Sequence, residues 1–281
     1  MTKNSINSTL FLGKVWQHFD ELPSTNDFLM SDVGFRMSEG VSSAEIPNPK
    51  SDIKNTEGSL VTTFNQTAGR GQMGNRWLSE PNQNLAFSIR LNPTFLQAYE
   101  QFHLNKVVAL AVHDVVEKYI SNAVKSFNKN VSVKWANDIF IGDKKVCGIL
   151  IQNNLSGSTL QSSIIGIGLN INQLVFSKEL NATSLRLETG QLFDLFDCIE
   201  QLTKSIEQRY LQLKSAVSFS KIHDEYLSKM YRFGIEAIFR RATDDSVFMG
   251  KIVGVSPTGR LEIMSNRGIE VFDIKEVKFE I

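Results

Sequence analysis

The chain has 281 residues, of which 42% are hydrophobic and 21% are charged, a composition typical of a soluble globular protein with one or two domains. Thirty basic residues balance thirty acidic ones, so the chain lacks the overall basic field with which double-stranded DNA or RNA binders hold phosphates. Cys147 and Cys198 are far apart and flanked by apolar residues. This favours buried free thiols over a disulfide framework or a metal site.

No segment of the sequence predicts secretion or membrane insertion. The first twelve residues lack the apolar core of a secretory signal. The most apolar helical stretch, residues 107–116, is interrupted by His113 and Asp114. We therefore expect a cytoplasmic protein.

The first third of the chain alternates β-favouring runs with polar connections. Ser24 or Thr25 has N-cap chemistry for a helix that begins near residue 25. Residues 34–58 are rich in Ser, Asn, Pro and Lys without periodicity, which predicts a solvated loop or insertion. Strands are expected at 14–19, 60–64 and 85–91, with a glycine-rich loop at 69–75.

The middle of the chain predicts helices around a strand series. Apolar residues at helical spacing predict a helix over 104–120 that packs one face on a sheet. Turn residues at 142–144 and 153–157 have hairpin chemistry. The expected strands are 131–135, 139–141, 146–152 and 160–167, and further helices are expected at 191–214 and 220–229.

After Tyr231 the pattern changes to closely spaced β runs. The four runs are 235–239, 247–255, 261–264 and 269–274. They predict a small C-terminal β-barrel over residues 231–281, appended to an α+β domain over residues 1–230 with a mixed sheet and packed helices.

The segment from Gly69 to Gly74 matches the G-x-G-x-x-G pattern of dinucleotide-binding turns. Such a turn must open a helix, whereas here another strand is expected soon afterwards, so the context argues against a Rossmann site. Glycines permit close backbone approach to a ligand, and Arg70 could neutralise a carboxylate or a phosphate. An ordinary surface loop remains an equal alternative.

Three further segments combine strands with polar or glycine positions. Lys134 ends a strand and is followed by Asn137 and Asp138, although a solvated strand end would look the same. Gly148 interrupts an apolar strand, which often marks close approach by a ligand or another backbone. The segment 166–172 has glycines at alternate positions, which would bare one face of a strand for a flat ligand. Core packing explains the glycines equally well.

Together these segments resemble the biotin–protein ligase family. Its members carry S-T-N, Q-T-x-G-R-G-x-x-G, K-W-P-N-D, K-x-x-G-I-L and G-I-G-x-N-x-N in this order. The chain has matching segments at 24–26, 66–74, 134–138, 145–150 and 166–172. Each motif alone is weak, but five in the right order are specific. The resemblance covers about residues 15–175, and it is closest to ligases without a DNA-binding domain.

The resemblance implies a catalytic domain like that of class II aminoacyl-tRNA synthetases, followed by a small β-barrel. It implies a ligase that uses biotin and ATP with Mg²⁺ to form biotinyl-5′-AMP and pyrophosphate. The acceptor lysine of a biotin carboxyl carrier domain, from a carboxylase or decarboxylase, then takes the biotin and AMP leaves. A homodimer is compatible with the family, while no DNA or membrane partner is expected.

The resemblance also assigns roles to residues of this chain. Arg70 and Lys134 would stabilise the charge where the biotin carboxylate meets the triphosphate. The residues expected to bind biotin are Ser24, Thr25, Asn26, Gln66, Gly69, Arg70, Gly71, Gln72, Lys134, Gly148 and Gly166. The residues expected to bind the nucleotide are Arg70, Trp77, Asn137, Asp138, Lys145 and Asn170. No protein ligands for a metal ion are assigned.

Three features depart from the family pattern. Gln72 stands where the family often has a second arginine, so the loop carries less positive charge. Ala136 replaces the family's proline, which removes a backbone constraint but no chemical group. Residues 34–58 form a longer stretch than expected between the first two motifs.

Two alternatives compete with the ligase hypothesis. A lipoate or octanoyl attachment enzyme would share the fold and the acceptor type, but Q-T-x-G-R-G-x-x-G is not expected there. A non-catalytic biotin or nucleotide sensor would have no transition state to stabilise, so the presence of both Arg70 and Lys134 argues against it. The chain also leaves no room before Lys14 for the helix-turn-helix that some family members carry, so we expect no role in DNA binding.

Overall fold

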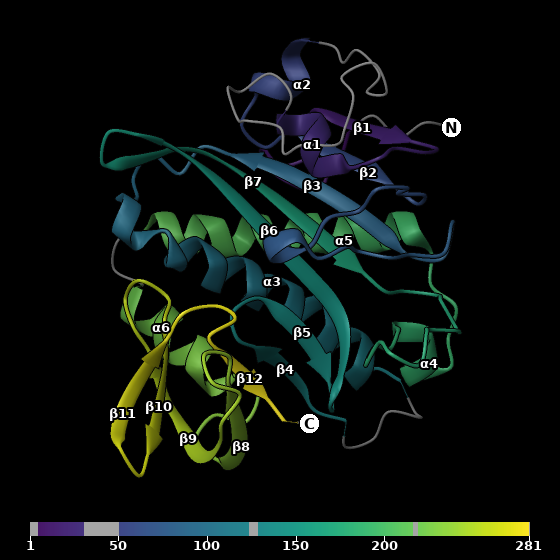
Figure 1. Cartoon of the computed structure of the whole chain (residues 1–281). Coiled ribbons are helices and arrows are strands. Elements are labelled where there is room, and N and C mark those ends of the chain that lie inside the picture. The colour runs from purple at the N-terminus through teal and green to yellow at the C-terminus, as the bar shows by residue number, and fades with distance from the viewer. Residues whose placement is uncertain (1–4, 31–50, 124–128, 216–218, 281) are drawn as a thin grey trace.

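A computed structural model describes residues 5–30, 51–123, 129–215 and 219–280 (Figure 1). Its larger sheet has seven strands in the order β1-β2-β3-β7-β6-β5-β4. Only the β1–β2 pair is parallel, so the sheet is mixed, as predicted. In sheet order the strands are Trp16–Phe19, Leu60–Thr63, Leu85–Leu91, Thr159–Leu169, Lys144–Ser156, Asp138–Ile141 and Val131–Lys134.

Helices pack on both faces of this sheet. On one face lie α3 (Phe102–Ser121) and α5 (Leu195–Lys214), which contact each other and the strands behind which they run in Figure 1. On the other face lies α1 (Thr25–Met30), against β2, β3 and β7. The Ser24 hydroxyl accepts a hydrogen bond from the Asp27 N–H at 3.2 Å, which makes Ser24 the cap of α1. The smaller α6 (Phe219–Ser228) packs on α3.

The C-terminal strands form a separate antiparallel sheet in the order β11-β10-β9-β8-β12. Its strands are Glu236–Arg241 (β8), Val247–Val255 (β9), Leu261–Ser265 (β10), Gly268–Phe272 (β11) and Val277–Phe279 (β12). The four predicted runs are all present, and β12 is an additional strand. Across the described residues, β11 and β12 do not pair with each other, so this module is an open sheet and the expectation of a closed barrel was wrong.

The chain runs along the edge of the large sheet before it enters the small one. The Val133 N–H donates to the Lys229 carbonyl at 2.8 Å, and the Tyr231 N–H donates to the Val133 carbonyl at 2.9 Å. The Trp135 indole N–H donates to the Gly259 carbonyl at 2.9 Å, which joins the two sheets again. We keep 1–230 and 231–281 as a proposed division into domains.

Several elements differ from the sequence-based expectation. Part of the predicted 34–58 loop forms the short helix α2 (Ser51–Asn55), while residues 34–50 lie outside the described residues. The helix α4 (Leu185–Thr189) was not predicted. The β6–β7 hairpin is longer than predicted because polar residues continue its ladder out to Ser156 and Thr159. Within the described ranges, no helix is both long and apolar enough to cross a membrane.

Candidate functional site

A row of small residues crosses the face of the large sheet that carries α1. Ala86 pairs with Gly168, Gly168 pairs with Gly148, and Gly148 pairs with Asp138. Paired residues on neighbouring antiparallel strands point to the same side. The row therefore leaves a shallow floor without large side chains, which ends at a carboxylate.

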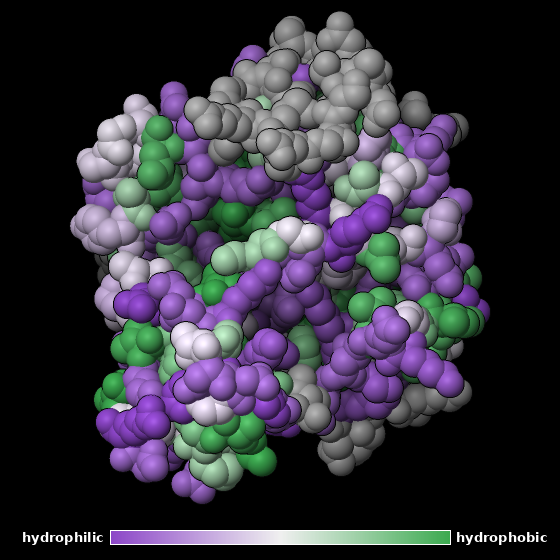
Figure 2. All heavy atoms as spheres, viewed as in Figure 1, coloured by the Kyte–Doolittle hydropathy of each residue, from purple (hydrophilic) through white to green (hydrophobic). Residues whose placement is uncertain are grey.

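A cavity opens over this floor. Figure 2 shows the hollow near the middle of the molecule, in front of β6 and β7. It contains about 720 Å³ of empty space including its open mouth. Its lining consists of Ser24, Thr25, Asn26, Gln66, Arg70, Gly71, Gln72, Asn75, Arg76, Trp77, Ala86, Asn137, Asp138, Lys145, Gly148, Ile149, Leu150, Gly166, Ile167 and Gly168.

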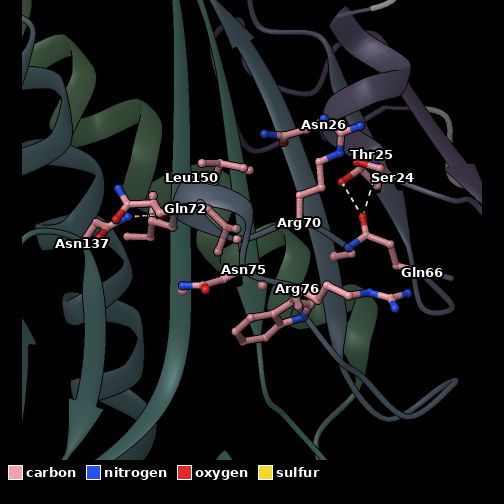
Figure 3. A pocket seen from close by; sticks show the side chains of 18 of the residues that line it. Ser24, Thr25, Asn26, Gln66, Arg70, Gln72, Asn75, Arg76, Asn137 and Leu150 are labelled. Atoms are coloured by element: carbon pink, nitrogen blue, oxygen red, sulfur yellow. Dashed lines mark hydrogen bonds between the residues drawn. The ribbon is translucent and has the colours of Figure 1, made fainter. Parts of the chain in front are cut away.

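Polar side chains gather where α1 meets the cavity (Figure 3). The Gln66 side-chain oxygen accepts hydrogen bonds from the Thr25 N–H at 3.0 Å and from the Thr25 hydroxyl at 3.3 Å. Behind them, the Ser88 hydroxyl lies 2.6 Å from both the Thr25 hydroxyl and the Asn26 side-chain oxygen. The Asn26 amide donates to Gln152 at 3.0 Å. Each of these side chains is thus held in a defined orientation at one end of the cavity.

The glycine-rich loop forms a small hairpin and opens no long helix. The Gly71 N–H donates to the Asn75 carbonyl at 2.7 Å, and the Trp77 N–H donates to the Gly69 carbonyl at 3.0 Å. A single 3₁₀ turn, Gln72–Gly74, forms the tip. The Rossmann interpretation is therefore excluded. A Cβ at Gly69 would lie 2.5 Å from the Trp77 carbonyl, so this glycine serves the packing of the hairpin and does not line the cavity.

The Trp77 indole lies over the glycines of the floor. A Cβ at Gly168 would come within 2.3 Å of the ring, and one at Gly148 within 3.2 Å. A Cβ at Gly166 would lie 2.2 Å from the Asn26 side-chain oxygen. The glycines do leave one sheet face bare, but in this structure a tryptophan ring and an amide of the protein itself occupy that space.

Two ion pairs border the cavity. The Arg70 Nε lies 3.0 Å from a carboxylate oxygen of Asp27, and burial raises the pKa of Asp27 more than Arg70 and Ser24 lower it. The Lys145 ammonium lies 2.8 Å from an Asp138 oxygen and 5.7 Å from the centre of the Trp77 ring. Anions that enter the cavity would therefore meet positive groups from two directions.

Lys134 lies beside the cavity and not in its lining. It pairs with Asp138 in the strand register, and its side chain is thus one position further along the same row. Its ammonium lies 4.9 Å from the centre of the Phe140 ring and 5.1 Å from that of Phe279 in the C-terminal module. Burial lowers the pKa of Lys134, and the nearby Asp138 offsets part of this effect.

The two predicted asparagines also differ in position. Asn137 lines the cavity at the end away from α1, and its amide donates to the Ile149 carbonyl (Figure 3). Asn170 is buried outside the lining, where its amide donates to the Thr183 carbonyl at 3.0 Å. Its side-chain oxygen accepts no hydrogen bond in the described structure.

Comparison with known proteins places the chain in a family. Residues 48–170 match the model of the Biotin/lipoate A/B protein ligase family. The biotin–[acetyl-CoA-carboxylase] ligase of Paracoccus denitrificans is 30% identical over 224 residues, which cover 78% of this chain and 89% of that protein. The chain belongs to the biotin protein ligase family.

Other relatives of the family agree in sequence and fold. The bifunctional ligase/repressor BirA of Bacillus subtilis is 34% identical over 219 residues, and the match spans 64% of that protein. The structure of the Aquifex aeolicus biotin protein ligase in complex with biotin and ATP superposes with a TM-score of 0.68 at 27% identity. That superposition covers 94% of this chain and 99% of the other.

The structure brings most of the predicted site residues of this family member together. Gly69, Lys134 and Asn170 lie outside the cavity lining, and the other predicted residues line it. Sequence reasoning missed Asn75, Arg76, Ala86 and the apolar Leu150, as well as Ile149 and Ile167, whose side chains face the core on the other side of the sheet. It also missed Ser88 and Gln152, which lie behind the polar end and carry no motif signal.

Metal-ligand clusters and free thiols are two further kinds of chemistry-bearing group that could lie within the part of the chain that the structure describes. In the described ranges, no three His, Cys, Asp or Glu side chains are grouped as metal ligands would be. Cys147 and Cys198 are buried free thiols, as predicted.

Proposed function

We propose that this protein is an ATP-dependent biotin protein ligase. In the first step, a biotin carboxylate oxygen attacks the α-phosphate of Mg·ATP, which forms biotinyl-5′-AMP and releases pyrophosphate. In the second step, the amine of an acceptor lysine attacks the acyl carbon, which forms an amide and releases AMP and a proton. The observation that carries the proposal is one cavity that combines an oriented polar end, a glycine floor and cationic side chains.

The polar end suits the ureido ring of biotin. Thr25, Asn26 and Gln66 offer both donors and acceptors. The Thr25–Gln66 hydrogen bonds and those of Asn26 with Ser88 and Gln152 fix their directions. Leu150, which pairs with Gly166, supplies apolar wall beside them. A site that hydrogen-bonds a ligand's polar edge rejects analogues that lack it, because its own buried groups would remain unpaired.

Charge stabilisation is assigned to Arg70 and Lys134. Two anions must approach each other, and fixed positive charge at their meeting point lowers the barrier. Arg70 lines the cavity. Lys134 shares the row of Asp138, and we propose that its flexible side chain leaves the Phe140 ring and swings toward the cavity when the two anions bind. Magnesium enters with ATP as part of the substrate.

The nucleotide is assigned to the end of the cavity away from α1. Lys145 and Asn137 supply a cation and an amide there, and the Trp77 ring offers an aromatic face for adenine. Asn170 would join only after its buried amide turns from Thr183. Closure of the glycine-rich loop over the adenylate would keep water from the anhydride.

The acceptor is proposed to be the lysine of a biotin carboxyl carrier domain. The name of the Paracoccus relative specifies acetyl-CoA carboxylase as its substrate protein. We propose a location in the cytoplasm, because ATP is available there and thiols such as the two free buried cysteines stay reduced.

Biotin-dependent exchange of labelled pyrophosphate into ATP tests the first step. Exchange is expected with biotin and not with lipoate, since exchange with lipoate alone would indicate a lipoate enzyme. Lys134→Ala should abolish exchange and leave most of the biotin affinity, which isothermal titration calorimetry measures. Unchanged exchange in this variant would contradict the role of Lys134, whereas a wild-type protein that binds biotin without any exchange would favour a sensor.

A further inference from the structure

Asp27 is a buried carboxylate next to the cavity that the proposed reaction does not use. Its side chain is 1% exposed, and apart from the ion pair with Arg70 neither carboxylate oxygen has a hydrogen-bond partner in the described structure. A buried charge is costly unless a countercharge lies beside it. The Arg70 Nε, 3.0 Å away, is that countercharge.

The guanidinium of Arg70 has one edge against Asp27 and a second edge without a partner among the described residues. A guanidinium offers one edge at Nε and another between its two terminal nitrogens. Asp27 lies against Nε, while no described residue forms a hydrogen bond or ion pair with the terminal nitrogens. Arg70 lines the cavity, and in Figure 3 its side chain extends along the cavity toward α1. Its terminal edge has no partner among the described residues.

The backbone around Arg70 cannot hold the guanidinium by itself. Gly69 and Gly71 flank it on a hairpin loop, and a long arginine side chain has many rotamers. Asp27, by contrast, belongs to α1, whose six residues are all buried and which packs on β2, β3 and β7. Asp27, which lies on a fixed helix, therefore anchors the side chain of Arg70, which lies on a loop.

We propose that Asp27 is a positioning residue for adenylate formation. It holds the Nε edge of Arg70 so that the terminal edge faces the carboxylate and phosphate oxygens that react. This inference rests on the proposed ligase function. In the alternative, a placeholder role, Asp27 competes with substrate for Arg70. Removal of the Asp27 charge would then lower the KM for biotin and leave kcat unchanged.

The variant Asp27→Asn tests the proposal, because it keeps the shape of the side chain and removes its charge. The cap of α1 is preserved, since Ser24 accepts from the backbone N–H of residue 27. The kcat of biotin-dependent pyrophosphate exchange is expected to fall about tenfold or more, with a biotin KM within about threefold of wild type. A lower KM with unchanged kcat would establish a placeholder and overturn the proposal. Unchanged kinetics would overturn it as well.

Two controls separate positioning from general damage. Glu21→Gln changes a nearby exposed carboxylate that accepts from Asn65 at 2.6 Å and does not line the cavity, and it should leave kcat unchanged. In an Arg70→Gln background, Asp27→Asn should lower kcat by less than about twofold, because the group that it positions is already lost. If Asp27→Asn lowers kcat by the same factor in the Arg70→Gln background as in the wild type, the proposal is contradicted.

A readout independent of turnover separates this inference from the ligase proposal. In ¹⁵N NMR spectra of the full chain, the Nε–H of Arg70 should exchange slowly with water and should become fast in Asp27→Asn. If this change occurs in a protein without exchange activity, the ion pair stands and the ligase function fails. If the wild type is active and Arg70 Nε–H exchanges equally fast in both proteins, the positioning role fails alone.

Discussion

Gly148, Gly166 and Gly168 form the floor of the cavity beneath the side chains of Trp77 and Asn26. The alternate glycines at 166 and 168 and the isolated Gly148 predicted a bare sheet face, and the structure confirms that face. Nothing in the sequence showed that Trp77 covers it, because a ring from a hairpin loop reaches the floor only through tertiary packing. Lys134 was likewise expected inside the cavity but lies beside it, because a strand position does not give the direction of a long side chain.

Gly168→Ala should disturb the cavity more than Gly148→Ala. The added methyl would lie 2.3 Å from the Trp77 ring at position 168, but 3.2 Å from the ring and from the mobile end of Lys145 at position 148. Overpacking of this kind costs about 1–3 kcal/mol. We expect Gly168→Ala to lose that much free energy of unfolding in urea and to raise the KM for ATP. Gly148→Ala should lose less than about 1 kcal/mol, and equal losses would contradict the stacking.

Gln72→Arg should retain the adenylate at least as well as the wild type. Gln72 lines the cavity in the turn at the tip of the loop, so an arginine there would add positive charge near the phosphate. Release of biotinyl-5′-AMP after rapid dilution measures the effect. Gln72→Met, which keeps a side chain of similar length and adds no charge, is the matched control. Faster release from the arginine variant would show that charge at this position does not hold the adenylate.

At the scale of elements, periodicity identified the long segments and missed the short ones. The predicted helix over 104–120 corresponds to α3, and the predicted strand over 85–91 has the observed bounds of β3. The five-residue α4 and the three-residue β12 are too short for a periodic signal. The β6–β7 ladder extends through Asn153 and Asn154, whose polar composition suggested a turn. There, cross-strand pairing overrides local propensity.

Asp194→Ala should weaken α5 without affecting catalysis. The Asp194 carboxylate accepts hydrogen bonds from the Phe196 N–H at 2.8 Å and from the Asp197 N–H at 3.0 Å, which caps the helix far from the cavity lining. Loss of such a cap costs about 1 kcal/mol. Urea unfolding should detect this loss while pyrophosphate exchange stays constant. Asp197→Ala, which removes a first-turn charge but no cap, should cost only about 0.3–1 kcal/mol.

At the scale of the whole molecule, the C-terminal module touches the site at two places. The Lys275 ammonium donates to the Met73 carbonyl at the tip of the glycine-rich loop at 2.9 Å, and Phe279 packs near Lys134. The sequence predicted the module as closely spaced β runs but gave neither its contacts nor its open edge. Contacts between residues about 200 positions apart depend on how the two sheets pack, which no local pattern encodes.

Lys275→Met should loosen the glycine-rich loop. The substitution removes one hydrogen bond, which contributes about 0.5–1.5 kcal/mol, and keeps most of the apolar side chain. We expect release of biotinyl-5′-AMP to accelerate about two- to tenfold in rapid-dilution experiments. The exposed Lys278, in the same module, provides the matched control as Lys278→Met. Equal release rates in the two variants would exclude a role for the contact in loop closure.

The central claim is that the cavity joins biotin to a protein through an adenylate. The most direct measurement is incubation of the protein with biotin, ATP, Mg²⁺ and a purified biotin carboxyl carrier domain, followed by mass spectrometry of the acceptor. A mass increase of one biotinyl group on a single lysine is expected, dependent on ATP and strongly reduced in Arg70→Gln. A folded protein that binds biotin but leaves the carrier domain unmodified would contradict it.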